Sequence, residues 1–391
     1  MASEQIIPPQ ENIREGRLKT GTFYTQEVYQ NKLLDGITAV AGRWGQPIIK
    51  SEDDGTGFRT LFQSRQLHED PASNEQMQHQ EELEVAKLCV DEICVNNRWN
   101  PEEIDCVIFG NGMLDRKPEE YIRAFSRQIG LSQSAEQRAQ VISLACNSFG
   151  KAFNTAVADP ELEGKKVVVM DVERITRYMG TVPPLHEDLL SRTVFSDGYA
   201  AVGFVPGVSI EHLYSESYEE EDTRGALSAI TAYRDFVDFS SDEFIHHDDR
   251  GEFIRLPRPP EGQWIQMSGS DTAKHFLRML GTLARSFQVK VGELFPDIEI
   301  HQITGHHASR GVNISLGNLL QKIGLLEEIG RDEQRNFSWK NFKWLVPDGN
   351  ASGATSGIAL SRLLPVLEKD QNILMFSFGA GASATASLYR V

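Results

Sequence analysis

The chain has few cysteines and no long apolar run. Its four cysteines among 391 residues include no CxxC pair, so no disulfide framework is expected and a reducing, cytoplasmic location is favoured. No apolar run approaches the roughly 18 residues of a membrane span, so no membrane partner is expected. The opening MASEQIIPPQENIREG lacks the basic-then-apolar order of a secretory signal, and residues 1–20 are expected to form a polar, mobile arm.

Positive charge is also in short supply. Lys and Arg number 39 against 56 Asp and Glu, which gives a formal net charge of −17. This balance argues against a general nucleic-acid binder, and an anionic ligand would need a local cluster of basic side chains. The length suits two domains or two fused halves rather than one simple core.

The chain does contain alternating helix and strand patterns. Apolar residues spaced by 3, 4 and 3 positions predict an amphipathic helix over 81–98. Short apolar runs predict buried strands in NPEEIDCVIFGNG (100–112), KKVVVMDVE (165–173) and NILMFSFGAG (372–381). Continuous apolar strands between helices indicate the α/β class, with sheets covered on both faces.

A weak internal repeat divides the chain into two similar halves. Residues 100–111, NPEEIDCVIFGN, parallel 295–306, FPDIEIHQITGH, and each half then continues with a small-residue turn, a helix and a strand. FSDGYAAVGFV (195–205) and FSFGAGASATASLYRV (376–391) close the halves in the same way. We therefore predict two duplicated α/β halves. The expected division is the arm at 1–20, a first half at 21–210, an acidic connection at 211–262 and a second half at 263–391. The connection could cover an active-site mouth or be a solvated loop.

Cys146 lies in VISLACNSFGKAF (141–153), between an apolar run and a predicted helix. A free cysteine is often simple core packing, but the positive end of a helix lowers a thiol pKa and favours a nucleophile. In the second half His306 ends a predicted strand, and Asn350 precedes the matching helix. Facing halves would bring Cys146, His306 and Asn350 to one pocket, with His307 as an alternative to His306.

Four stretches, taken in order, resemble one family. They are LACNSFGKAF (144–153), GHHAS (305–309), GNASGAT (349–355) and FGAGASATASLYRV (378–391), and WIQMSGSDTAKHF (264–276) adds a weaker likeness. Together they resemble the thiolase-fold condensing enzymes, most closely β-ketoacyl-acyl-carrier-protein synthase III, over about residues 55–391. The resemblance implies a layered αβαβα architecture and a homodimer.

The resemblance also implies a reaction. Cys146 would take an acyl group from a thioester, with the backbone N–H groups of Cys146 and Ala380 holding the oxyanion. His306 and Asn350 would then stabilise the enolate formed by decarboxylation of a malonyl-type thioester. Acyl-carrier-protein or coenzyme A thioesters would be the partners, with no further cofactor, no metal and no nucleic acid. A specialised fatty-acid or polyketide pathway is expected.

Several positions depart from the family pattern. Ser148 and Ala380 stand where glycine is usual, and Gly311 stands where a phosphate-binding arginine is common, beside Arg310. Lys117 lies near the expected acyl gate. The substrate-binding candidates are Lys117, Arg310, Gly379 and Gly381. Two other functions stay open at this point: an acyltransferase that passes the acyl group to an alcohol or amine, and a non-catalytic partner subunit of a ketosynthase.

Overall fold

The computed structural model describes most of both halves. The described residues are 19–20, 24–25, 71–112, 117–173, 198–219, 231–232, 243–247, 253–257, 263–264, 269–308, 310–326, 328–331, 337–339, 341–342, 350–363, 367–379 and 383–391. The helices are α3 (Pro71–Asn97), α4 (Pro118–Ile129), α5 (Gln133–Arg138), α6 (Ser148–Ala158), α8 (Gly269–Leu294), α9 (Arg310–Lys322) and α10 (Ala354–Leu363). The strands are β1 (Lys19–Thr20), β2 (Tyr24–Thr25), β3 (Cys106–Gly110), β4 (Gln140–Ile142), β5 (Val167–Glu173), β6 (Gly198–Phe204), β7 (Glu211–Glu219), β8 (Thr231–Ala232), β9 (Glu243–His247), β10 (Phe253–Pro257), β11 (Gln263–Trp264), β12 (Gln302–Gly305), β13 (Glu328–Arg331), β14 (Phe337–Trp339), β15 (Asn372–Gly379) and β16 (Ser383–Arg390).

The two halves repeat one strand arrangement. In the first sheet, β5 pairs in parallel with β3 and antiparallel with β6. In the second sheet, β15 pairs in parallel with β12 and antiparallel with β16. The outer strand of each sheet also matches, because β1 pairs antiparallel with β6 and β7 pairs antiparallel with β16. The predicted α/β class with two duplicated halves is therefore confirmed.

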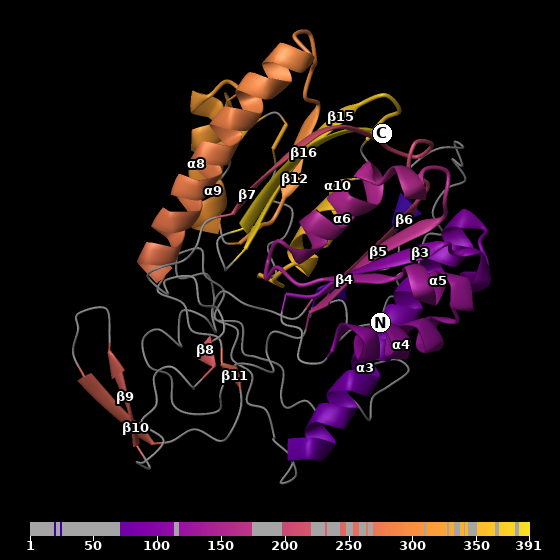
Figure 1. Cartoon of the computed structure of the whole chain (residues 1–391). Coiled ribbons are helices and arrows are strands. Elements are labelled where there is room, and N and C mark those ends of the chain that lie inside the picture. Colours follow the sequence, from indigo (N-terminus) through magenta and orange to yellow (C-terminus); the bar gives the residue numbers. More distant parts are fainter. Residues whose placement is uncertain are drawn as a thin grey trace, which may run out of the picture.

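The sheets and helices form five layers (Figure 1). Helices α6 and α10 lie between the two sheets, where α6 contacts β3, β5 and β15, and α10 contacts β5, β6 and β12. Helices α3 and α4 cover the outer side of the first sheet, and α8 covers the outer side of the second. The predicted helix 81–98 coincides with residues 81–97 of α3, and the three predicted buried strands are β3, β5 and β15.

Strand β5 shows why these runs are apolar on both faces. Val167 and Val169 pack in the central core with α6 and α10. Val168, Met170 and Val172 pack in the outer core with α3 and α4. Since successive side chains alternate across a strand, Asp171 and Glu173 fall on the central face, at the end of the strand where α6 and α10 begin. This edge of the sheet holds the candidate site.

The predicted acidic connection at 211–262 needs a correction. Residues 211–219 form β7, which pairs with β16 along its length, so they belong to the second sheet. One side of an edge strand faces solvent and carries polar and acidic residues, which concealed the strand pattern in EHLYSESYE. The rest of the connection contributes the pair β9–β10 and strand β8, which pairs with β11 just beyond the end of the connection. Its other residues, and residues 1–18 of the arm, lie outside the described residues.

Within the described ranges, no helix combines the length and apolar character that crossing a membrane would require.

Candidate active site

Cys146 lies in a tight turn between β4 and α6. Ala145 has a φ of 46°, in the left-handed region, and Asn147 N–H donates to the Leu144 carbonyl at 3.0 Å. Helix α6 begins at Ser148, two residues after the cysteine, as the sequence predicts. Cys146 is 7% exposed. Cys146 therefore lies immediately before a helix N-terminus, whose positive dipole end favours a thiolate.

The Ser148 side chain is hydrogen-bonded to the backbone of this turn. Its hydroxyl accepts the Leu144 N–H at 2.9 Å and donates to the Ala145 carbonyl at 2.7 Å. The side chain is fully buried. The sequence shows Ser148 as a departure from the glycine usual in the resembled motif, and the structure gives that hydroxyl two partners within the turn.

Asn350 has a fixed amide orientation. Its Oδ1 accepts the Ser352 N–H at 2.9 Å and the Thr355 hydroxyl at 3.4 Å. Because a backbone N–H can only donate, the oxygen must face Ser352 and the amide NH₂ must point away from it. The residue is 3% exposed and lies four residues before α10.

His306 follows β12 and is held by the neighbouring strand. Its backbone N–H donates to the Phe376 carbonyl at 2.8 Å. Its ring meets the ring of Phe378 edge-on, with centroids 4.9 Å apart. The imidazole also lies beside the backbone of Ser352. Burial and, secondarily, the neighbouring His307 lower the pKa of His306 to about 3, so the ring is neutral at physiological pH.

Two glycines show that these segments meet. A methyl group placed on Gly112 would lie 2.5 Å from Ser352 Oγ and 3.0 Å from the carbonyl carbon of Ala145. A methyl group placed on Gly379 would lie 2.7 Å from the Cys146 nitrogen. The Cys146 turn, the loop 350–353 and the end of β15 are therefore in contact. His306 joins them through Ser352, whereas His307 packs its ring against Phe342.

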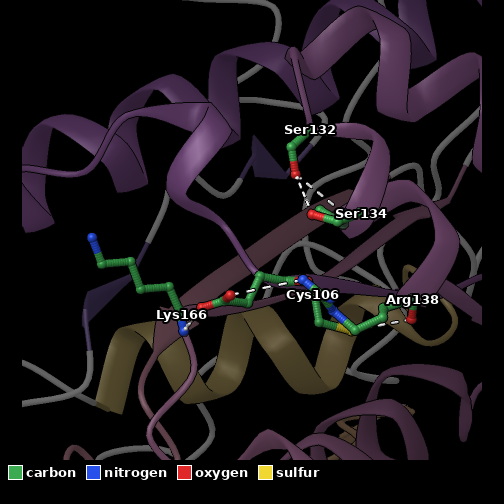
Figure 2. Close-up of polar contacts among 7 residues, drawn as sticks. Cys106, Ser132, Ser134, Arg138 and Lys166 are labelled. Atoms are coloured by element: carbon green, nitrogen blue, oxygen red, sulfur yellow. Dashed lines mark hydrogen bonds and ion pairs between the residues drawn. The ribbon is translucent and has the colours of Figure 1, made fainter.

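The other cysteines do not have this setting. Cys106, the first residue of β3, donates from Sγ to the Arg138 carbonyl at 3.3 Å, as Figure 2 shows. Burial raises the pKa of the Cys106 thiol to about 11. Burial also raises the pKa of Cys94, and Cys89 is fully buried in the same outer core. These thiols pack the core, which leaves Cys146 as the candidate nucleophile among the four.

Some predicted site residues are not placed at the site. Ala380 and Gly381 lie outside the described residues, as does the Arg310 side chain at the start of α9. Lys117 is exposed and occupies the N-cap of α4 without a side-chain capping bond. Gly379 differs from these because it touches the Cys146 backbone directly.

The sequence reasoning missed a buried acid pair beside the site. Asp171 is fully buried and Glu173 is 2% exposed, and both lie at the end of β5. Glu173 accepts a hydrogen bond from the Gly112 N–H. The sequence did contain a signal for this pair. Two acids spaced two apart at the end of an otherwise apolar strand share one face, and a buried acid is costly unless it has a specific role.

We compared the chain with known proteins by sequence and by structure. A scan against protein-family models and a search of curated proteins each found no match. Solved structures do match. A 3-oxoacyl-(acyl-carrier-protein) synthase III superposes with a TM-score of 0.61 at 18% identity, covering 96% of this chain and 99% of the other.

Two further structures agree. 1,3,6,8-Tetrahydroxynaphthalene synthase from Streptomyces coelicolor, a type III polyketide synthase, has a TM-score of 0.57 at 15% identity, covering 96% of this chain and 97% of its own. The OleA protein of Xanthomonas campestris has a TM-score of 0.58 at 13% identity, covering 96% of each chain. This chain has the thiolase fold.

The thiolase fold explains the repeated strand order and the central pair α6 and α10. Each half supplies a helix N-terminus to the same edge, so Cys146 before α6 and Asn350 before α10 occupy equivalent places in the two halves.

Proposed function

We propose that this chain is a condensing enzyme of the β-ketoacyl synthase III type. The observation that carries the proposal is the contact between the Cys146 turn and the loop that bears Asn350, with neutral His306 beside the same loop. A nucleophile from one half and two uncharged polar groups from the other are the components that acyl loading and decarboxylation require.

In the first half-reaction the Cys146 sulfur attacks the carbonyl carbon of an acyl thioester. A new C–S bond forms, the original C–S bond breaks, and the carrier thiol leaves with the proton. The Cys146 N–H, joined by the Ala380 N–H in the resembled family, would hold the oxyanion. Gly379 supports this role, because its contact with the Cys146 nitrogen brings the tail strand to the required place.

In the second half-reaction a malonyl-type thioester loses carbon dioxide. The electron pair of the broken C–C bond becomes an enolate, whose oxygen would accept hydrogen bonds from the Asn350 amide and from His306. The enolate carbon then attacks the acyl-Cys146 thioester, a C–C bond forms, and the Cys146 sulfur is released. Neutral donors suit this step, since they stabilise developing charge without a proton transfer.

The remaining features of the proposal are supported by the resemblance. They are acyl-carrier-protein or coenzyme A thioesters as substrates, a homodimer, a cytoplasmic location and a role in a specialised fatty-acid or polyketide pathway.

The test is intact-protein mass after incubation with a panel of acyl thioesters, followed by carbon dioxide release from a malonyl-type thioester. The native protein should gain one acyl mass, and Cys146→Ala should gain none. Cys106→Ala is the matched control and should load normally, since its thiol packs the core. Equal labelling of Cys146→Ala would overturn the assignment. Loading followed by transfer to an alcohol or amine, with no carbon dioxide release, would replace condensation with acyltransfer.

A further inference from the structure

Asp171 occupies a space that two glycines leave open. It pairs with Gly110 in the register of β3 and β5, and a methyl group on either Gly110 or Gly353 would collide with its Oδ2. The same methyl positions lie 3.0 Å from the Phe149 nitrogen and 3.1 Å from Ser148 Cβ, respectively. The carboxyl group therefore lies between β3, the first turn of α6 and the loop before α10.

This carboxyl group has an unusual hydrogen-bonding environment. In the part of the chain that the structure describes, no N–H or O–H group donates to either oxygen of Asp171. The Glu173 side chain lies on the same face of β5, two residues along, and is also buried. Keeping two neighbouring buried carboxylates ionised is costly when one of them has no donor, so one of the two holds a proton.

The surroundings indicate which residue carries the proton. Glu173 accepts the Gly112 N–H, which suits a carboxylate, whereas Asp171 lacks a donor and is fully buried. Burial and, next, the charge of Glu173 raise the pKa of Asp171 well above its usual range. Among the described residues, those placed against Asp171 from β3 and the loop before α10 are Gly110 and Gly353, neither of which is titratable.

We propose that protonated Asp171 and ionised Glu173 form a one-proton pair that positions the Cys146 turn against the loop carrying Asn350. Asp171 is a positioning residue, because it acts through Glu173 and the glycines around it. Glu173 holds Gly112, which contacts both Ala145 and Ser352. The effect on activity rests on the proposed function, but the shared proton does not.

The first test is spectroscopic and uses the full chain without substrate. At neutral pH exposed carboxylates are ionised, so an infrared band of a carboxylic acid carbonyl reports buried acids. The native protein should show such a band, and uniform labelling with isotopic aspartate should shift it without any mutation. Asp171→Asn should lack the band, while Glu368→Gln, at an exposed carboxylate, should keep it. Absence of an isotope-sensitive band in the native protein would overturn the proposal.

The second test separates positioning from simple filling of space. Asn keeps a hydrogen-bond donor toward Glu173, and Ala does not. We expect Asp171→Ala to lower carbon dioxide release by at least about tenfold more than Asp171→Asn, the scale of one lost hydrogen bond to a buried charge. Equal losses in the two variants would show that the shared hydrogen bond does not position the site. A native protein that has the infrared band but releases no carbon dioxide would contradict the proposed function and leave the proton pair standing.

Discussion

Gly379 lies so close to Cys146 that a methyl group placed on the glycine would be 2.7 Å from the cysteine nitrogen and 2.6 Å from the Asn147 nitrogen. Real side-chain carbons do not approach backbone this closely, so the turn and β15 could not keep their contact if the glycine were replaced. The end of the tail strand and the nucleophile turn therefore form one unit, although they are far apart in the sequence.

Gly379→Ala should impair acyl loading. The added methyl group would displace the Cys146 N–H from the forming oxyanion, and loss of one such donor costs roughly 10²–10³-fold in rate. Loading is measured as the rate of acyl mass gain. Gly292→Ala, in open space on α8, is the matched control and should load at the native rate. Native-rate loading by Gly379→Ala would show that this contact does not shape the oxyanion site.

Asn350→Ala should separate the two half-reactions. Its amide would act on the enolate, so carbon dioxide release should fall by roughly 10²–10³-fold while acyl loading persists. Asn372→Ala removes a buried amide that binds the Glu299 carbonyl at the other end of β15, and it should leave the ratio of the two rates unchanged. If Asn350→Ala abolishes loading, the roles are wrongly divided.

Ser148→Ala should weaken the nucleophile turn. It would leave the Leu144 N–H without the acceptor that the hydroxyl provides, whereas the Ala145 carbonyl would keep the Ser148 backbone N–H at 3.0 Å. Loss of a part-buried hydrogen bond of this kind costs about 0.5–1.5 kcal/mol, so both the urea midpoint and the loading rate should fall. Ser361→Ala is the control, because that buried hydroxyl bonds only carbonyls of its own helix. An equal effect on loading in both variants would argue against a specific role for Ser148.

His306 should make stability depend on pH. Its folded pKa of about 3 lies below the ordinary value of 6.5, so the unfolded chain binds more protons between these values. The contribution is fully present above pH 6.5 and is lost progressively as the pH falls toward 3. The difference between the urea midpoints of His306→Asn and the native protein should therefore shift in favour of the variant as the pH is lowered through this window. A constant difference would mean that His306 is not held neutral by burial.

The sequence by itself determined the local features of the site. Apolar runs and helix periodicity located β3, β5, β15 and α3, because each pattern depends on residues adjacent along the chain. The repeat predicted two halves with the same strand order, and the turn before α6 marked Cys146. Strand β7 was not predicted from the sequence, because the polar side of an edge strand resembles an acidic loop.

Only the tertiary structure determined which distant segments of the chain are in contact at the site. The contact of Gly379 with Cys146, the position of His306 beside Ser352 and the burial of Asp171 and Glu173 on one face of β5 each depend on how the sheets and helices pack. Protonation states follow the same rule, since a neutral His306 and a protonated Asp171 arise from burial. Burial is set by elements that come from distant parts of the chain, and no local pattern of residues encodes it.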